Sequence, residues 1–166
     1  MSGRVGMGFD VHPFSSDGAR PLVLGGVTID GAGLDGHSDA DVVAHAVADA
    51  VLGAAALPDL GTLFPASDEQ YRGASSIELL TEVAGRVAQR RLWVVNVDVV
   101  VAAEQPRLAP HVEQMGENLV AALAAAREPM GEALRVSVKA KRAEGLGAIG
   151  RAEGIAAWAV ALLERG

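Results

Sequence analysis

The sequence lacks cysteine and has few aromatic residues, and each absence excludes a way of building the protein. Without cysteine there are no disulfides and no thiolate metal sites, so His and carboxylates remain as the strong metal ligands. Aromatic residues make up 4% of the chain while half of it is hydrophobic, which predicts a core built mainly from Val, Leu and Ala. A length of 166 residues suits one domain, which we expect to span residues 1–166.

Long apolar runs and an excess of positive charge are also lacking. The most apolar segment, residues 42–57, is interrupted by His45 and Asp49, so it does not suit a membrane span. The first six residues lack the apolar run of a signal peptide. A net charge of -7 disfavours nucleic-acid binding, which needs clustered Lys and Arg. We therefore expect a cytoplasmic protein that binds neither membranes nor nucleic acids.

Strand signals and helix signals alternate along the chain. β-branched runs predict strands at residues 5–11, 22–24, 27–29, 93–103 and 134–140, with a hairpin at the Gly25-Gly26 pair. The Val-rich strand at 93–103 is expected to be covered on both faces. The final run, residues 154–163, fits either a helix or a buried strand. This alternation predicts an α/β or α+β fold in which helices cover a sheet.

Three helices are predicted between these strands. The first starts at Ser38 as N-cap and ends near residue 56, before Pro58. The second runs from a capping box at Ser75–Glu78 to about residue 91, with Glu82 and Arg86 paired on its surface. The third covers about residues 110–127. Residues 57–74 are rich in Gly, Pro and Asp and predict a long loop, which is often functional.

Three polar residues near the start of the sequence predict a metal site. Asp10 and His12 are two apart, so on a strand their side chains share one face. His45 lies on the first predicted helix, which is able to complete the set. Two imidazoles and one carboxylate are typical ligands of a catalytic zinc that keeps a position open. Asp49, one helical turn after His45, is expected to hydrogen-bond the free ring nitrogen of His45.

The spacing alone leaves a second interpretation open. Asp-x-His is a short and common pattern. In this interpretation Asp10 caps a turn, His12 lies on the surface, and His45 is a core histidine with its hydrogen bonds satisfied.

An ordered series of short motifs along nearly the whole chain closely resembles the 2-C-methyl-D-erythritol 2,4-cyclodiphosphate synthase family. These motifs are Gly8–His12, Leu24–Val27, His37–Val42, Ala44–Ala46, Asp49–Ala55, Asp59–Gly61, Leu63–Pro65, Asn96–Asp98, Ala103–Arg107, Pro110-His111 and Gly150–Gly154. No single motif is decisive, but their order is highly specific.

The resemblance implies a fold, an assembly and a reaction. The fold is α+β, a mixed β-sheet with helices packed on one face, in which the C-terminal run is a strand. Three chains form a homotrimer whose sheets line a central channel, with active sites at subunit interfaces. Such enzymes are lyases of the non-mevalonate isoprenoid pathway. They convert 4-diphosphocytidyl-2-C-methyl-D-erythritol 2-phosphate to 2-C-methyl-D-erythritol 2,4-cyclodiphosphate and CMP.

The resemblance also implies two metal sites. Zn²⁺ or another divalent ion is expected at Asp10, His12 and His45. Mg²⁺ or Mn²⁺ is expected at Glu144, together with the substrate diphosphate. Two cations offset the negative charge that builds up when one phosphate attacks another.

Substrate contacts implied by the resemblance fall into four groups, with His37 and Arg142 as catalytic residues. His37 and Ser38 match the site for the 2-phosphate, which we expect at the N-terminus of the first helix; Ser38 alternatively serves as a plain N-cap. The contacts are Asp10, Val11, His12, His37 and Ser38; Asp59, Leu60 and Gly61 at the erythritol hydroxyls, with a loop of Phe64, Pro65, Ala66, Ser67 and Asp68; Ala103, Glu104, Gln105, Pro106, Arg107, Leu108 and Ala109 around cytidine; and Lys141, Arg142, Ala143, Glu144, Ala148 and Arg151.

The sequence departs from the family pattern before Glu144. The usual Ala-Thr-Thr-Thr-Glu is replaced by Ala140–Glu144, which reads Ala-Lys-Arg-Ala-Glu. Our hypothesis is that Lys141 or Arg142 contacts the diphosphate in place of the threonine hydroxyl. The alternative is that both side chains point to solvent. Gly145 and Ala148 also replace a common Lys and a common aromatic residue, and Arg107 replaces a frequent Lys.

Two other functions remain open at this stage. One is a trimer that binds metal or ligand and has lost catalysis through the altered Lys-Arg-Ala run. The other is a metal-dependent phosphohydrolase, which would release a linear product.

Overall fold

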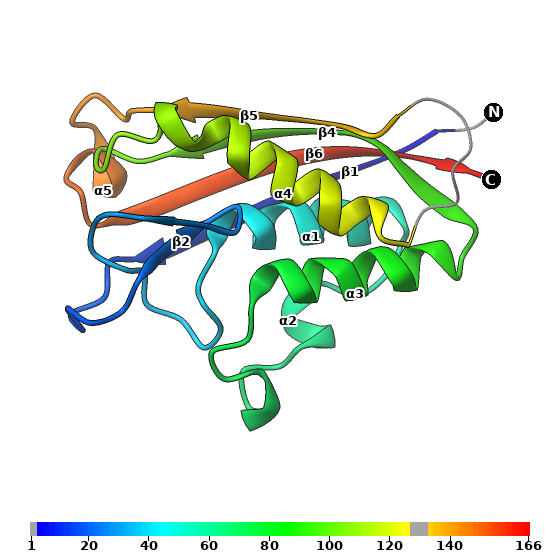
Figure 1. Cartoon of the computed structure of the whole chain (residues 1–166), viewed down its shortest axis with the longest axis horizontal. Helices are drawn as coiled ribbons and strands as arrows, with labels where there is room; N and C mark the ends of the chain where they lie inside the picture. Colours follow the sequence, from blue (N-terminus) through cyan, green and yellow to red (C-terminus); the bar gives the residue numbers. More distant parts are fainter. Residues whose placement is uncertain (1–2, 127–132) are drawn as a thin grey trace.

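A four-stranded mixed sheet forms the frame of the molecule. The computed structural model describes residues 3–126 and 133–166 (Figure 1). The strand order is β1-β6-β4-β5, with β6 antiparallel to both of its neighbours and β4 parallel to β5. The strands are β1 (Arg4–Pro13), β4 (Leu92–Ala102), β5 (Arg135–Lys141) and β6 (Gly154–Arg165). The final run is therefore a strand, as the resemblance implied.

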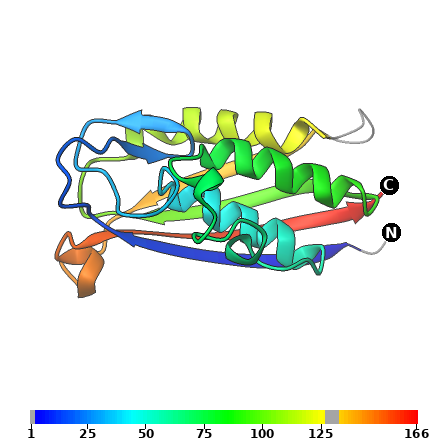
Figure 2. The ribbon, with the colours of Figure 1, turned by 90° about the horizontal axis from the view of Figure 1, so that it is seen from below.

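Three long helices pack on one face of this sheet (Figures 1 and 2). The helix α1 (Val42–Ala54) contacts β1 and β6, α4 (Val112–Ala124) contacts β5, and α3 (Ser76–Ala88) packs against α1 and α4. The core between these layers consists mainly of Val, Leu and Ala, as the composition predicted. The predicted α+β fold with helices on one face is thus confirmed. In the described ranges 3–126 and 133–166, no helix combines the length and apolar character needed to cross a membrane.

Short elements complete the chain. β2 (Leu22–Leu24) and β3 (Val27–Ile29) form the predicted hairpin. The segment predicted as a long loop contains α2 (Leu60–Leu63) and the 3-10 turn η1 (Glu69–Tyr71). A second 3-10 turn, η2 (Ala109–His111), precedes α4, and α5 (Gly147–Gly150) precedes β6. The predicted end of the third helix at residue 127 lies outside the described residues.

Two glycines of β1 allow α1 to lie directly on the sheet. A Cβ atom at Gly8 would be 1.9 Å from the carbonyl oxygen of Ala46, and one at Gly6 would be 2.0 Å from that of Ala50. Both partners are backbone atoms of α1, so only a residue without a side chain fits at either position. This close approach brings α1 to the strand that carries Asp10 and His12.

The opposite face of the sheet is divided into an apolar half and a polar half. On β1 and β6 it exposes a continuous apolar strip consisting of Val5, Met7, Phe9, Val11, Trp158 and Val160. Phe9 and Trp158 are cross-strand partners with ring centroids 5.2 Å apart. Toward β5 the face is polar, and Lys139 donates to Asp98 at 2.5 Å. Strand β4 is therefore not covered on both faces within one chain, because Asp98 and Val100 are only half-buried.

The predicted N-cap of the first helix is wrong. Asp41, not Ser38, caps α1: its fully buried carboxylate accepts from the backbone N–H groups of Val43 and Ala44 at 3.0 Å. The same carboxylate accepts from Gly25 at 2.8 Å and Gly26 at 2.7 Å, which ties the hairpin to the helix. The helix therefore begins three residues later than the Ser38 prediction requires.

The capping box predicted for α3 does not form either. Ser75 occupies the N-cap position, but its side chain makes no capping hydrogen bond. The backbone N–H of Ser76 instead donates to the Asp39 carboxylate at 3.0 Å. A carboxylate from the preceding segment thus takes the place of the local cap. The predicted Glu82–Arg86 pair does form, at 2.5 Å.

Candidate metal centre and substrate site

Asp10, His12 and His45 meet where β1 passes over α1. Asp10 Oδ2 lies 2.9 Å from His45 Nδ1 and 3.1 Å from His12 Nε2. One ligand atom from each residue lies within 4.8 Å of the others. The predicted convergence is confirmed, and the interpretation that scattered these residues over a turn, the surface and the core is wrong.

In both His12 and His45, the ring nitrogen that points away from Asp10 contacts another residue. His12 Nδ1 donates to the backbone carbonyl of Asp35 at 2.5 Å, and because a carbonyl only accepts, this nitrogen carries the proton. His45 Nε2 lies 2.8 Å from Ser76 Oγ and 3.2 Å from Ser38 Oγ. The nitrogens that face Asp10 are thereby the ones available to a cation. One carboxylate oxygen and two imidazole nitrogens make a donor set that fits a divalent ion such as zinc.

Asp49 does not hold His45, contrary to the prediction. Its carboxylate accepts from the backbone N–H of Leu60 at 2.8 Å and so anchors the start of α2. The ring nitrogen it was expected to meet is taken by Ser76, a residue 31 positions away in the sequence. Burial raises the pKa of Asp49 above the ordinary aspartate value.

Electrostatics favour an anionic Asp10 between its two imidazoles. Burial opposes ionisation of Asp10, but hydrogen bonds with His12 and His45 outweigh it and hold the pKa of Asp10 well below its usual range. The hydrogen bond to Asp10 in turn raises the pKa of His12 above its ordinary value, against the effect of burial.

A hollow of about 270 Å³ opens beside these ligands. Many of its lining residues come from the segments predicted to bind the 2-phosphate and erythritol: His37, Ser38, Leu60, Gly61, Phe64 and Ala66. Asp59 caps α2 by accepting from the N–H of Thr62 at 2.7 Å. The backbone carbonyl of Asp68 lies 3.1 Å from His37 Nε2. The structure thus brings the metal ligands and this predicted segment together.

Some predicted contacts lie elsewhere in this region. Val11 is 47% exposed on the opposite face of the sheet, so its side chain points away from the hollow. Pro65 and Ser67 belong to the turn that follows α2. The first-turn N–H groups of α1 that were expected to bind the 2-phosphate are occupied by Asp41. The first-turn N–H groups of α1 therefore cannot assist His37 and Ser38 in binding the 2-phosphate.

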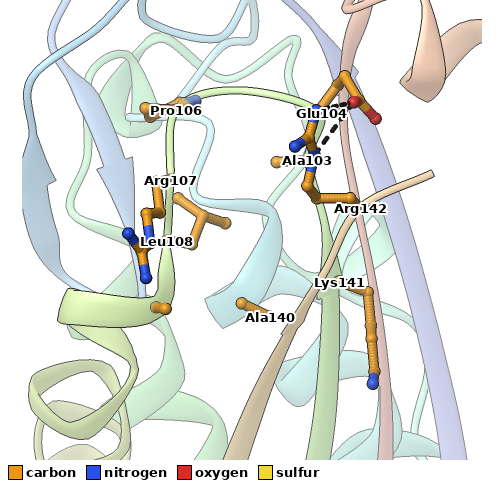
Figure 3. Close-up of a pocket in the computed structure, with 9 residues that line it drawn as sticks. Ala103, Glu104, Pro106, Arg107, Leu108, Ala140, Lys141 and Arg142 are labelled. Carbon is orange, nitrogen blue, oxygen red and sulfur yellow. Dashed lines mark hydrogen bonds and ion pairs between the residues drawn. The ribbon is translucent and has the colours of Figure 1, made fainter. Parts of the chain in front are cut away.

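A second hollow, of about 430 Å³, lies at the ends of β4 and β5 (Figure 3). Its lining combines the predicted cytidine segment with the altered basic run: Ala103, Glu104, Pro106, Arg107, Leu108, Ala109, Ala140, Lys141 and Arg142. Figure 3 shows Arg142 reaching to Glu104 while Lys141 extends in the opposite direction. Gln105 lines a separate, smaller hollow with Phe14.

The guanidinium of Arg142 is paired with Glu104. Arg142 Nε donates to Glu104 Oε1 at 3.1 Å, and Nη2 donates to the same oxygen. The hydrogen bond from Arg142 lowers the pKa of Glu104. Glu104 Oε2 is buried and, within the described parts of the chain, has no hydrogen-bond partner. Arg142 therefore lines the second hollow, while its guanidinium is already paired with the Glu104 carboxylate.

The two hollows have no lining residue in common. The register places Asp10, Ala157, Val101 and Ala140 in one row across the sheet. Three inter-strand steps separate Asp10 from Ala140, a distance of roughly 14 Å.

Glu144 follows the end of β5 and is exposed. The group of possible metal ligands found among residues 3–126 and 133–166 consists of Asp10, His12 and His45 and does not include Glu144. Ala143 is half-buried, Ala148 is exposed, and Arg151 donates to Glu153 at 2.6 Å.

Sequence reasoning missed three residues around the metal ligands: Asp35, Asp39 and Ser76. Asp35 acts through its backbone, which no side-chain pattern reveals. Asp39 belongs to a quoted motif, but only the fold shows that it contacts the start of α3. Ser76 belonged to the segment expected to form a capping box, so its contact with His45 was not predicted.

The fold and these residues define an α+β domain with a candidate divalent-cation site beside a hollow. A family model described as the YgbB family matches residues 3–164, and the chain belongs to this family, that of the 2-C-methyl-D-erythritol 2,4-cyclodiphosphate synthases.

Similar proteins cover the chain almost completely. The 2-C-methyl-D-erythritol 2,4-cyclodiphosphate synthase of Syntrophomonas wolfei is 54% identical over 98% of this chain and 99% of its own length. The enzyme of that name from Rubrobacter xylanophilus is 56% identical over 98% of this chain and 95% of its own. Among solved structures, IspF of Plasmodium falciparum in complex with CDP has a TM-score of 0.81 and 31% identity, covering 99% of this chain and 97% of that one. Bifunctional IspDF of Campylobacter jejuni has a TM-score of 0.89 and 38% identity over 99% of this chain and 43% of that one.

Proposed function

We propose that this chain converts 4-diphosphocytidyl-2-C-methyl-D-erythritol 2-phosphate to 2-C-methyl-D-erythritol 2,4-cyclodiphosphate and CMP. One observation carries the proposal. In a chain of this family, Asp10, His12 and His45 bring three ligand atoms within 4.8 Å of one another at the hollow that the predicted erythritol segment lines.

The reaction needs no protein nucleophile. An oxygen of the substrate's own 2-phosphate forms a bond to the β-phosphorus, and the bond from that phosphorus to the departing CMP breaks. Asp10, His12 and His45 would hold zinc, and Glu144 would hold magnesium or manganese with the diphosphate. When bound, these cations supply the positive charge that offsets the charge of the approaching phosphates. The chain's own contribution is to hold the two ends of one substrate together.

Binding is divided among the segments that surround the two hollows. In the proposal, His37 and Ser38 hold the 2-phosphate, and Asp59 to Gly61 hold the erythritol hydroxyls. Residues 103–109 receive the cytidine, with Arg142 at the diphosphate. The separation of the hollows within one chain supports a site completed by a neighbouring copy.

We further propose a homotrimer with the open sheet face directed to a central channel. An exposed strip of six large apolar side chains on β1 and β6 supports this, since contiguous apolar surface commonly marks an interface. Location in the cytoplasm stays a prediction from the sequence.

Incubation of the purified chain with substrate, zinc and magnesium tests the proposed function. We expect CMP together with a cyclic diphosphate, which phosphorus NMR distinguishes from a linear product. A linear phosphate product would indicate a phosphohydrolase. Substrate that binds but does not react would indicate a binding protein, and either result would overturn the proposal.

Replacing Arg142 by Thr tests its role at the diphosphate. A charge-assisted hydrogen bond contributes about 1.5–3 kcal/mol, so R142T is expected to lower turnover by roughly 10- to 100-fold. It is also expected to raise the magnesium concentration needed for half-maximal rate. R72T is the control, because Arg72 is about as exposed as Arg142 and is likewise paired with a glutamate, Glu69. Unchanged turnover and unchanged metal dependence in R142T would count against the role.

The raised pKa of His12 predicts the pH dependence of zinc binding. A proton on His12 competes with the metal, and its pKa lies above the ordinary 6.5. Affinity is therefore expected to be highest at alkaline pH and to begin falling while the pH is still above 6.5. Asp10 stays ionised over this range because its pKa is lowered. Chelator competition across pH 5–9, corrected for the chelator's own protonation, measures this; a decline confined to pH below 6.5 would contradict it.

A further inference from the structure

We propose that Ser76, oriented by Asp39, is a positioning residue that fixes the ring of His45 with Nδ1 directed at the metal site. The inference rests on the metal site of the proposed function. It assigns a role to two residues outside the predicted ligand set.

The contacts form a chain of three side chains, from α1, α3 and the segment that precedes α1. Ser76 is the first residue of α3 and is 2% exposed. Its hydroxyl donates to Asp39 Oδ1 and lies 2.8 Å from His45 Nε2. Its backbone N–H donates to the other oxygen, Asp39 Oδ2, at 3.0 Å. The hydroxyl and the backbone N–H of Ser76 therefore both donate to the Asp39 carboxylate.

Counting the protons fixes the tautomer of His45. A serine hydroxyl has a single proton, and a carboxylate only accepts, so this proton is used toward Asp39. Ser76 Oγ must then act as acceptor toward the imidazole, which places the ring proton on Nε2. Nδ1, 2.9 Å from Asp10 Oδ2, is then the ring nitrogen that faces the cation site. An imidazole that keeps a proton on Nε2 binds a metal through Nδ1.

Ser38 does not replace this contact. Its oxygen is farther from His45 Nε2, at 3.2 Å, and it already accepts from the backbone N–H of Ala40 at 3.2 Å. The Ser76 hydroxyl is also not needed to cap α3. The backbone of Ser76 makes the capping bond to Asp39, and an alanine at position 76 keeps that bond.

Ser76→Ala tests the role, with Ser76→Thr as the conservative variant and Ser75→Ala as the matched control. Ser75 is the neighbouring residue and makes no side-chain capping bond. Loss of a group that orients a metal ligand typically costs 10- to 100-fold in affinity. S76A is expected to bind zinc 10- to 100-fold more weakly in chelator competition. S76T is expected to restore most of the affinity, and S75A to match the original chain.

Proton–nitrogen NMR of the histidine rings supplies the second readout. In the zinc-loaded protein we expect the Nε2 proton of His45 to exchange slowly with solvent because Ser76 accepts it, and S76A to exchange this proton faster. A merely structural role for Ser76 would lower thermal stability without changing this exchange. Zinc-loaded unaltered protein in which His45 binds the metal through Nε2 would overturn the inference even if S76A failed to fold.

The outcomes also separate this inference from the proposed function. If the unaltered chain binds zinc and releases CMP while S76A equals it in affinity and in exchange of the Nε2 proton, only the positioning role is wrong. If the unaltered chain binds no zinc, the metal site itself is wrong, and the positioning role is wrong with it.

Discussion

Replacing Asp10 by Ala is expected to abolish tight zinc binding and to lower CMP release by about a thousandfold or more. Asp10 is the only anion of the three-residue cluster and contacts both imidazoles through one oxygen. Its loss removes a ligand and leaves the two rings without the carboxylate that sets their approach. A bound cation contributes several kcal/mol to phosphoryl transfer, and about 4 kcal/mol corresponds to three powers of ten in rate.

Zinc content by elemental analysis and initial rates of CMP release measure this effect together. D30A is the control, because Asp30 is an exposed residue at the end of the hairpin. Circular dichroism shows whether D10A keeps its secondary structure. A folded D10A that retained stoichiometric zinc and more than a tenth of the activity would contradict the assignment of Asp10 as a ligand.

Replacing Gly8 by Ala is expected to destabilise the protein by more than about 3 kcal/mol. The added methyl group would be 1.9 Å from the backbone oxygen of Ala46 and 2.6 Å from the backbone nitrogen of Ala50. Backbone of a packed helix does not yield as a flexible side chain does, so α1 as a whole must move away from β1. Overpacking costs typically 1–3 kcal/mol and sometimes more, and we place this case at the upper end.

The same displacement moves His45 away from Asp10, so G8A is expected to lose metal affinity as well as stability. Gly85 offers a control of opposite sign within the molecule. It lies inside α3, where an added Cβ meets nothing within 4 Å. G85A is expected to gain about 0.5–1 kcal/mol, since alanine is the better helix former. Urea unfolding of both variants gives the comparison, and a G8A protein as stable as the original would refute the packing argument.

Local patterns predicted the parts of the fold that depend on neighbouring residues. Alternation placed Asp10 and His12 on one face of β1, and the glycine pair placed the hairpin between β2 and β3. The convergence of His45 with these residues was one of two interpretations that the spacing left open, and the family resemblance favoured it. The C-terminal strand was ambiguous by periodicity alone, and only the family resemblance decided it correctly.

Failures arose where distant residues compete for one group. Ser38 looked like a helix cap, but Asp41 satisfies both the helix and the hairpin, whose Gly25 and Gly26 precede it by about 16 residues. Asp49 looked like the partner of His45, but Ser76 reaches that ring from another helix. Contacts between elements decide such competitions, and a single sequence carries no local signal for them.

The second hollow shows how far the sequence predicted the substrate site. Residues 103–109 and the basic run at 141–142 were predicted from separate motifs, and the ends of β4 and β5 bring them together. The pairing of Arg142 with Glu104 was not predicted, because 38 residues separate them. The assignment of cytidine and diphosphate to this hollow stays a prediction, as does the role of Glu144.

A crystal grown with zinc and measured at the zinc absorption edge tests the central claim most directly. We predict one strong anomalous peak bonded to Asp10 Oδ2, His12 Nε2 and His45 Nδ1, with a further coordination position open toward the hollow. Well-ordered density in which these three side chains surround no anomalous scatterer, under saturating zinc, would contradict the account.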